Sequence, residues 1–357
     1  MTAQPYSPAR HRVMGFPAGP MAWRRWQNFK ANRRAWWSFW MFMGLIVVSL
    51  FADVIANDRP ILVAMDGKLF FPSVIAYPET AFGGQFPTAA DFSDPYMAQL
   101  IAEKGGFVLN PLIPFRYDTL IVGLAQPAPA PPSALNWLGT DDQARDVVAR
   151  VIYGFRLSVL FGLLLTLGSS AIGIALGLVQ GFFGGWIDLI GQRLIEIWGG
   201  LPTLFILILL ASILVPSFWI LLGFLLLFSW TALTGLVRAE VLRARNFEYV
   251  RAARALGVGN AAIMWRHVLP NAMVASITML PFITAGALTA LTSLDFLGYG
   301  LPPGSPSLGE LVAQGRSNLF APWLAFTGFV TITVMLTLLV FIGEGVRDAF
   351  DPRKTLR

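Results

Sequence analysis

The sequence predicts an all-α membrane protein with six transmembrane helices. Hydrophobic residues make up 55% of the 357 residues and charged residues only 13%, a composition unlike that of a soluble globular protein. A membrane helix needs about 20 apolar residues to cross the bilayer core, and uncharged stretches of that length recur along the chain. Basic and acidic residues gather in different segments between these stretches, which predicts a definite topology.

The first two spans lie on either side of a long polar segment. The first, 35–54, begins with a cluster of tryptophans that suits a membrane interface. Its basic flank is long, and no small-residue cleavage site fits better than a continued span, so we expect an uncleaved helix rather than a secretory signal. The second uncharged stretch runs over 157–187.

The next uncharged stretch, 197–237, contains 41 residues. As one helix it would be about 60 Å long, which is twice the thickness of the bilayer core. We therefore predict a hairpin of two helices with its turn at Pro216-Ser217. Two further windows, 268–294 and 317–343, hold 27 uncharged residues each and complete the six spans.

Arginine and lysine in the flanks predict the orientation of these helices. Residues 1–36 carry seven basic residues and no acid, and 238–267 carries six arginines against two glutamates, whereas 55–150 carries ten acids and six bases. Both termini and the 238–267 loop are thus expected in the cytoplasm. The expected segments are a cytoplasmic N-terminus with an amphipathic interfacial helix (1–34), the first span (35–54), a periplasmic segment (55–156), a helical core with five spans (157–347) and a cytoplasmic tail (348–357).

Composition also excludes several chemistries. The chain has no cysteine and only two histidines, so disulfides, iron–sulfur clusters and histidine-rich metal sites lack their ligands. No Gly-x-x-x-x-Gly-Lys-Ser/Thr motif is present, so any ATP must be bound by another chain. We expect no catalytic residue, cofactor or metal in this chain. The basic, aromatic N-terminus favours a membrane surface over nucleic acid.

Four glycines recur at every fourth position of the second span: Gly173, Gly177, Gly181 and Gly185. This spacing predicts a smooth helical face on which another helix packs closely. The partner helix can belong to this chain or to another subunit.

Charged residues inside the spans are what ion-coupled transporters need, and here they lie at the margins, as Asp188, Glu196, Asp295 and Glu344 do. No filter motif of a channel is present either. A stand-alone secondary transporter or channel is the alternative class.

The most informative polar segment is the loop around 248–258. Tyr249, Ala252, Ala253 and Leu256 follow helical spacing along one stripe, with arginines beside it. Gly257 can end this helix, Asn260 can cap the next one, and Pro270 marks the start of the fifth span. Small side chains flanked by arginines predict a helix that another protein grips.

This loop resembles the EAA loop of binding-protein-dependent ABC importer permeases. The pattern Arg-Ala-Ala-x-x-x-Gly stands at 251–257, and Leu269-Pro270 follows at the expected distance. The longer string from Glu248 to Asn271 is similar to the dipeptide/oligopeptide branch. Further similar motifs, in the family's order, are Gly139-Thr140-Asp141-Asp142-Gln143-Ala144-Arg145-Asp146, Phe296-Leu297-Gly298-Tyr299-Gly300, Pro322-Trp323-Leu324 and Gly345-Val346-Arg347-Asp348-Ala349-Phe350-Asp351-Pro352-Arg353. The resemblance covers roughly 20–55 and 137–353.

Three residues depart from the family's usual pattern and point to one branch of the family. Arg251 replaces the family's glutamate, Ala144 stands where glycine is usual, and Asp295 stands where many relatives have serine. Together with the long segment after the first span, these features are most similar to the Yej-type permeases, which are associated with microcin C and peptide uptake.

The resemblance implies the type I ABC importer permease fold in a bacterial inner membrane. It implies a permease that moves peptides (oligopeptide, murein peptide or microcin C type) into the cytoplasm by alternating access. The implied partners are a second homologous permease, ABC ATPase subunits that hold ATP and Mg²⁺, and a periplasmic peptide-binding protein. The implied ATPase-coupling residues are Glu248, Tyr249, Arg251, Ala252, Ala253, Arg254, Leu256, Gly257 and Pro270. His267 is expected to be structural.

The segment 55–135 has few periodic runs, and its proline-rich part, 126–132, predicts extended polyproline. It is too long for an ordinary connection. Two interpretations of this segment are open: an ordered docking cap and a proline-rich spacer.

Overall fold

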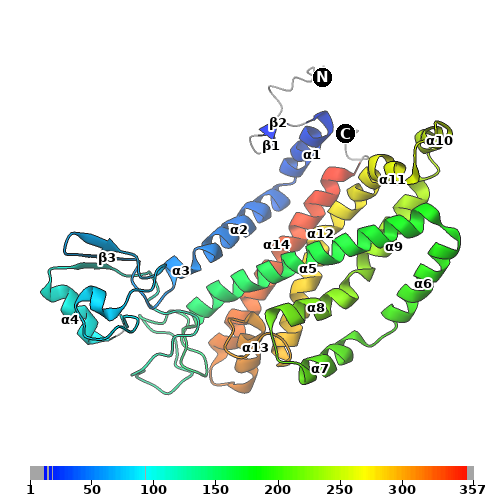
Figure 1. The fold of residues 1–357 in the computed structure, drawn as a ribbon. Helices are drawn as coiled ribbons and strands as arrows, with labels where there is room; N and C mark the ends of the chain where they lie inside the picture. Colours follow the sequence, from blue (N-terminus) through cyan, green and yellow to red (C-terminus); the bar gives the residue numbers. More distant parts are fainter. Residues whose placement is uncertain (1–11, 14–15, 18, 93, 352–357) are drawn as a thin grey trace. The chain divides into compact units, whose positions relative to one another are not determined.

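The computed structural model describes residues 12–13, 16–17, 19–92 and 94–351 (Figure 1). Most of these residues are helical, as the composition predicts. Two compact units are distinguished: the first contains 1–43, 161–290 and 334–357, and the second contains 44–160 and 291–333. Most of the predicted cytoplasmic tail lies outside the described residues.

Among the described residues, four helices are long and apolar enough to cross a membrane: Val147–Phe183, Phe218–Ala244, Asn260–Phe296 and Pro322–Phe350. A pair bent by 70°, α6 (Gly185–Gly199) and α7 (Thr203–Ile213), adds a fifth if it forms one span. The first predicted span is helix α2 (Arg33–Leu50), which is not among these helices. Arg33 and Arg34 fill its first turn and make it less apolar.

The observed helix bounds differ from the charge-free windows at several helix ends. Helix α5 (Val147–Phe183) begins before position 157, because Arg156 pairs with Asp53 and Arg150 with Glu310, so both arginines can stand inside the helix. The helix of the last window, α14 (Pro322–Phe350), begins at Pro322 rather than at 317. A short helix, α13 (Leu308–Ser317), and a loop precede it.

The first unit also contains the short terminal elements. Strands β1 (Arg12–Val13) and β2 (Phe16–Pro17) form an antiparallel pair. Helix α1 (Pro20–Ala31) follows, and its Phe29 is buried with Ala35 and Ala349. A side chain at Gly345 would collide with Ala35, so this glycine allows α2 and α14 to approach closely.

The predicted hairpin has its turn where the sequence places it. Helix α7 ends at Ile213, and α8 (Phe218–Ser229) begins after Ser217, whose hydroxyl accepts a hydrogen bond from the Ile220 amide at 3.2 Å. Helix α9 (Thr231–Ala244) continues the second arm of the hairpin.

The glycine face of α5 lies against α9. A Cβ atom at Gly173, Gly177 or Gly181 would come within 2.7–2.8 Å of a backbone carbonyl oxygen of Trp230, Thr234 or Arg238. These three glycines therefore pack within the chain. Gly185 does not share this contact: it has φ +55° and, with Gly184 at φ +66°, forms the break between α5 and α6.

The second unit holds a small folded insert. Strands β3 (Leu62–Met65), β4 (Lys68–Phe70) and β5 (Phe107–Leu109) form an antiparallel sheet in the order β4-β3-β5. With η1 (Glu79–Phe82) and α4 (Pro95–Glu103) they enclose an apolar core of Val63, Met65, Phe82, Met97 and Ile101. Helix α3 (Ala52–Ile55) precedes the sheet. The proline-rich part, 126–132, contains neither helix nor strand.

Candidate ATPase-coupling site

Helix α10 (Glu248–Ala255) forms the predicted coupling segment. Glu248 in its first turn and Arg254 in its last turn both complement the helix dipole. The helix ends where the sequence predicts, because Gly257 has φ +78°, in the left-handed region that favours glycine. The next short helix, α11 (Asn260–Ile263), begins after Gly259, so Asn260 is its first residue rather than its cap.

One face of α10 is buried within the chain. Val250 is fully buried and Ala253 is only 8% exposed, and both belong to a core with Val241, Ala244 and Ile263. The helical spacing in the sequence predicts that Ala253 lies on the exposed stripe that another protein contacts. In the structure this alanine instead packs inward and fastens the helix to its own subunit.

The other face of α10 is exposed. Tyr249 and Leu256 remain on the predicted stripe, and Leu256 is 83% exposed. The other exposed residues of the segment are Glu248, Arg251, Ala252, Arg254, Ala255, Gly257 and Val258. An exposed leucine between small and basic residues forms a surface on which another protein can dock.

Tyr249 joins α10 to helix α12 (Leu269–Phe296). The Asn271 side-chain amide donates to the Tyr249 hydroxyl at 2.6 Å and to the His267 carbonyl oxygen at 2.9 Å. The turn that carries His267, η2 (Met264–Val268), is a wide π-type turn. Pro270 is exposed, and because α11, η2 and α12 form one continuous helix, Asn260–Phe296, the span begins before this proline, whose missing N–H interrupts the helical hydrogen bonds next to the π-type turn.

Two arginines join this region to the end of α5. The Arg245 guanidinium donates to the Gly181 carbonyl oxygen at 3.0 Å, at the helix end where cations are favoured. The Arg254 guanidinium lies 5.1 Å from the centre of the Phe182 ring. Loop 238–267 is therefore attached to α5 by polar as well as apolar contacts.

A further ion pair joins α6 to α9. The Arg238 guanidinium donates to both carboxylate oxygens of Asp188, one of them at 2.7 Å. Such a fork-to-fork pair fixes orientation as well as distance. In the sequence Asp188 follows the uncharged stretch 157–187 and Arg238 follows the stretch 197–237, and the fold brings the two side chains together.

A separate charged cluster in the second unit contains the motif 139–146. Asp141, Arg145 and Arg150 are buried, and Glu310 on α13 approaches both arginines, at 3.1 Å and 2.7 Å. Burial by itself lowers the pKa of the Arg145 guanidinium. The hydrogen bonds and negative charges of Asp141 and Glu310 have a larger effect, so the pKa is raised. The sequence analysis did not identify Glu310, because it lies 165 and 160 positions from the two arginines with which it pairs.

Asp146 in the same motif is buried and accepts a 2.9 Å hydrogen bond from the Asn136 amide and a 2.8 Å bond from the Ala149 N–H. Burial raises the pKa of its carboxyl despite these bonds. Ala144 has φ +61°, which explains why glycine is usual at this position.

The described residues contain no group of three or more potential metal ligands. What the first unit presents is an exposed amphipathic helix that is fixed to three long apolar helices. This arrangement is that of an integral membrane permease.

The comparison with protein families agrees with this class. Residues 173–356 match the family described as binding-protein-dependent transport system inner membrane component. The chain belongs to this family. It is an inner-membrane permease of the ABC importer class and not a stand-alone transporter.

The chain is 55% identical to the peptidoglycan transport system permease protein YejE of Agrobacterium fabrum, over 95% of this chain and 94% of that protein. It is 53% identical to the inner membrane ABC transporter permease protein YejE of Escherichia coli, over 94% and 98% of the two chains. The dipeptide transport system permease protein DppC of Alkalihalophilus pseudofirmus is 35% identical over 62% of this chain and 73% of its own length. The predicted family and Yej-type resemblance are confirmed.

Proposed function

We propose that this chain is the permease subunit that moves peptides or peptide-like compounds, including murein peptides, from the periplasm to the cytoplasm in an ATP-driven importer. The names of its relatives support this substrate class, since they refer to peptidoglycan and dipeptide transport. The observation that carries the proposal is α10, a helix with one face fixed in the core and one face exposed.

The proposed topology has six spans. Helix α2 is the first, α5 the second, the bent pair α6 and α7 the third, α8 with α9 the fourth, α12 the fifth and α14 the sixth. Arginines in 1–36 and 238–267 support a cytoplasmic position for both termini and for α10. The insert of 55–156 then lies in the periplasm.

The proposed partners supply what this chain lacks. ATPase subunits bind ATP and Mg²⁺ and grip the exposed face of α10, so this chain hydrolyses nothing itself. A second, homologous permease completes the pathway, and a peptide-binding protein delivers the substrate. The family description, which names dependence on a binding protein, supports the last partner.

The contacts of α10 suggest how motion is transmitted. Closure of the ATPases displaces α10, and the Val250, Ala253 and Tyr249 contacts pass this displacement to the cytoplasmic ends of the long helices. Packed helices switch between discrete arrangements rather than deforming continuously. Alternating access by rigid-body movement follows from this.

We propose that the insert is a docking cap rather than a spacer. Its sheet has one face in the core and the opposite face outward, and the outward face carries Leu69 and Leu109 on the two edge strands together with Phe107. Leu69 is 62% exposed and Phe107 is 60% exposed. A peptide-binding protein is the partner that reaches this side of the membrane.

Mutation of the exposed face of α10 tests the proposal. Leu256→Asp places a charge on the surface that the ATPase contacts, whereas Arg243→Gln changes an exposed residue of α9. In proteoliposomes with the whole transporter and its binding protein, we expect Leu256→Asp to reduce peptide uptake and ATPase association at least tenfold. Arg243→Gln should leave both unchanged. Normal uptake by Leu256→Asp would show that α10 is not the coupling element.

A further inference from the structure

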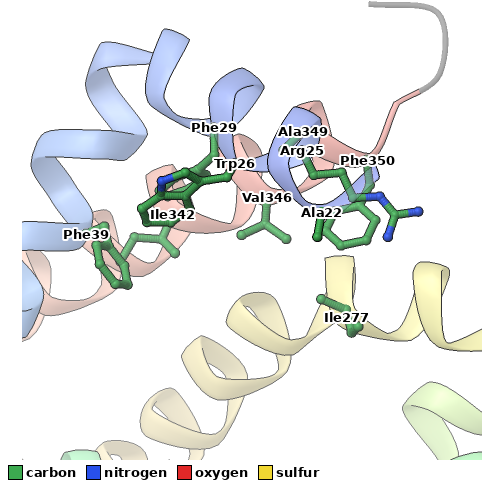
Figure 2. A pocket seen from close by; sticks show the side chains of 10 residues that line it. All are labelled: Ala22, Arg25, Trp26, Phe29, Phe39, Ile277, Ile342, Val346, Ala349 and Phe350. Atoms are coloured by element: carbon green, nitrogen blue, oxygen red, sulfur yellow. The ribbon is translucent and has the colours of Figure 1, made fainter. Parts of the chain in front are cut away.

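A cavity of about 350 Å³ lies in the first unit between α1, α2, α12 and α14 (Figure 2). Its lining comes from both terminal regions of the chain and from the beginning of α12. The ten lining residues are Ala22, Arg25, Trp26, Phe29, Phe39, Ile277, Ile342, Val346, Ala349 and Phe350. Ligand sites have volumes of about 300 to 1,000 Å³, so this cavity is large enough for a bound molecule.

The lining is almost wholly apolar. Arg25 is its only charged member, and the other nine side chains are aliphatic or aromatic. An apolar lining of this kind offers water no hydrogen-bond partner and favours hydrocarbon. Figure 2 shows Ile277 on α12 facing the side chains of α1 and α14 across the cavity.

A basic rim accompanies the apolar lining. The Arg25 guanidinium lies 4.2 Å from the centre of the Phe350 ring, and Figure 2 shows it extending past that ring. Between positions 19 and 36 the chain carries Arg24, Arg25, Lys30, Arg33 and Arg34 and no acid. This combination is complementary to a molecule with a hydrocarbon tail and an anionic head.

The position along the helices suits the same kind of molecule. Ile342 to Phe350 form the last turns of the membrane-spanning helix α14, so the cavity extends from the end of that helix to Ile277, further inside α12. Trp26 and Trp36 stand beside it, with the Lys30 ammonium 5.5 and 5.3 Å from their ring centres. Tryptophan and lysine are typical of the membrane interface.

A neighbouring cavity of about 390 Å³ also touches Phe350 but has a different character. Glu240, Asp348 and Asp351 contribute carboxylates to its lining, against Arg243 and Arg347. Arg243 is already paired with Glu240 at 2.7 Å. An anionic head is repelled there, so the head belongs at Arg25.

We propose that this cavity binds an anionic phospholipid, with an acyl chain between α1, α12 and α14 and the phosphate at the Arg25 guanidinium. Bound lipid would hold α1 against α14 and complete the packing of the termini. The inference is independent of the substrate and of the coupling role of α10.

Native mass spectrometry of the full-length chain, purified from membranes with its associated subunits, tests the site. The preparation is exchanged into equal amounts of phosphatidylglycerol, phosphatidylethanolamine and phosphatidylcholine. We expect one retained phosphatidylglycerol. Arg25→Gln should lower its retention about tenfold, the factor expected for one charge-assisted hydrogen bond. Arg266→Gln, on an exposed residue outside both the lining and this basic segment, should not.

A second variant separates binding from folding. Ala22 is exposed at the mouth of the cavity, so Ala22→Trp can block entry without disturbing the core, and unchanged thermal unfolding would verify this. A photoreactive phenylalanine at position 22 should crosslink to phospholipid in membranes. Equal retention of all three lipids, unchanged retention in Arg25→Gln and Ala22→Trp, or a crosslink only to a peptide of this chain or another subunit would each overturn the proposal.

Discussion

The Tyr249 hydroxyl accepts a hydrogen bond of 2.6 Å from the Asn271 side-chain amide, and this bond joins the exposed helix α10 to the first turn of α12. The same amide donates to the His267 carbonyl oxygen, so one side chain contacts both α10 and the last part of the π-type turn. A displacement of α10 cannot leave α12 in place without breaking this contact.

The first prediction concerns this hydrogen bond. Tyr249→Phe removes the hydroxyl and keeps the ring, so it should weaken the link between α10 and α12 by about 1 kcal/mol. In the reconstituted transporter we expect basal ATP hydrolysis to persist and its stimulation by substrate to fall several-fold. Asn271→Ala should have a similar effect, and the double variant should be no worse than either one. Additive losses would mean that the two residues act separately.

The second prediction concerns Ala144, which has φ +61°. A residue with a side chain loses about 1 kcal/mol in this region, and glycine does not. Ala144→Gly should therefore raise the stability of the second unit by about 1 kcal/mol, measured by thermal unfolding in detergent. Ala134 is exposed and is not among the residues with positive φ, so Ala134→Gly is the matched control and should give no gain. A loss of stability in Ala144→Gly would contradict the observed backbone conformation.

The third prediction concerns the pairing of Glu310 with two arginines. Glu310→Gln leaves Arg145 and the fully buried Arg150 with Asp141 as their remaining carboxylate. Removing one partner of a buried ion pair costs about 3 to 5 kcal/mol, and the Glu310 side chain is 27% exposed, so we expect about 2 kcal/mol. Thermal unfolding measures this loss. Glu103→Gln, on an exposed residue of α4, should leave the melting temperature unchanged. An unaltered melting temperature in Glu310→Gln would show that solvent already compensates the arginines.

Much of the fold follows from the sequence, and the exceptions have physical causes. Uncharged windows locate the hairpin turn at Pro216-Ser217 and the long helices, because lipid requires continuous apolar surface. They give the wrong start for α5, because Arg156 stands inside the helix when paired with Asp53, and Arg150 does so when paired with Glu310. That pairing joins residues 160 positions apart, which no local pattern reveals.

The candidate site likewise has some features that follow from the local sequence and others that do not. Spacing alone predicts α10 and its end at Gly257, both of which depend on local backbone preferences. It does not separate Ala252 from Ala253, which are adjacent and chemically identical, yet one is exposed and the other buried. Only the core formed by Val241, Ala244 and Ile263 decides which alanine faces inward.

The fourth prediction tests the topology. The chain has no cysteine, so single cysteines report their side of the membrane without interference. Lys68→Cys on the insert should react with an impermeant thiol reagent in intact spheroplasts. Leu256→Cys on α10 is also exposed, but it should react only after the membrane is permeabilised. Reaction of both cysteines in intact spheroplasts would exclude the proposed arrangement.

The last prediction concerns the outward face of the insert. In the register of the sheet, Leu69 and Phe107 both lie opposite Ala64, on the face away from the core residues Val63 and Met65. The double variant Leu69→Asp with Phe107→Asp should therefore fold normally, because neither residue is buried, but it should place two charges on the proposed docking surface. We expect stimulation of ATP hydrolysis by the loaded binding protein to fall at least tenfold while basal hydrolysis persists. Val74→Asp is the control, since Val74 is 77% exposed and lies outside the sheet. Full stimulation in the double variant would make the insert a spacer, and loss of the chain from the membrane would mean that this face packs within the transporter.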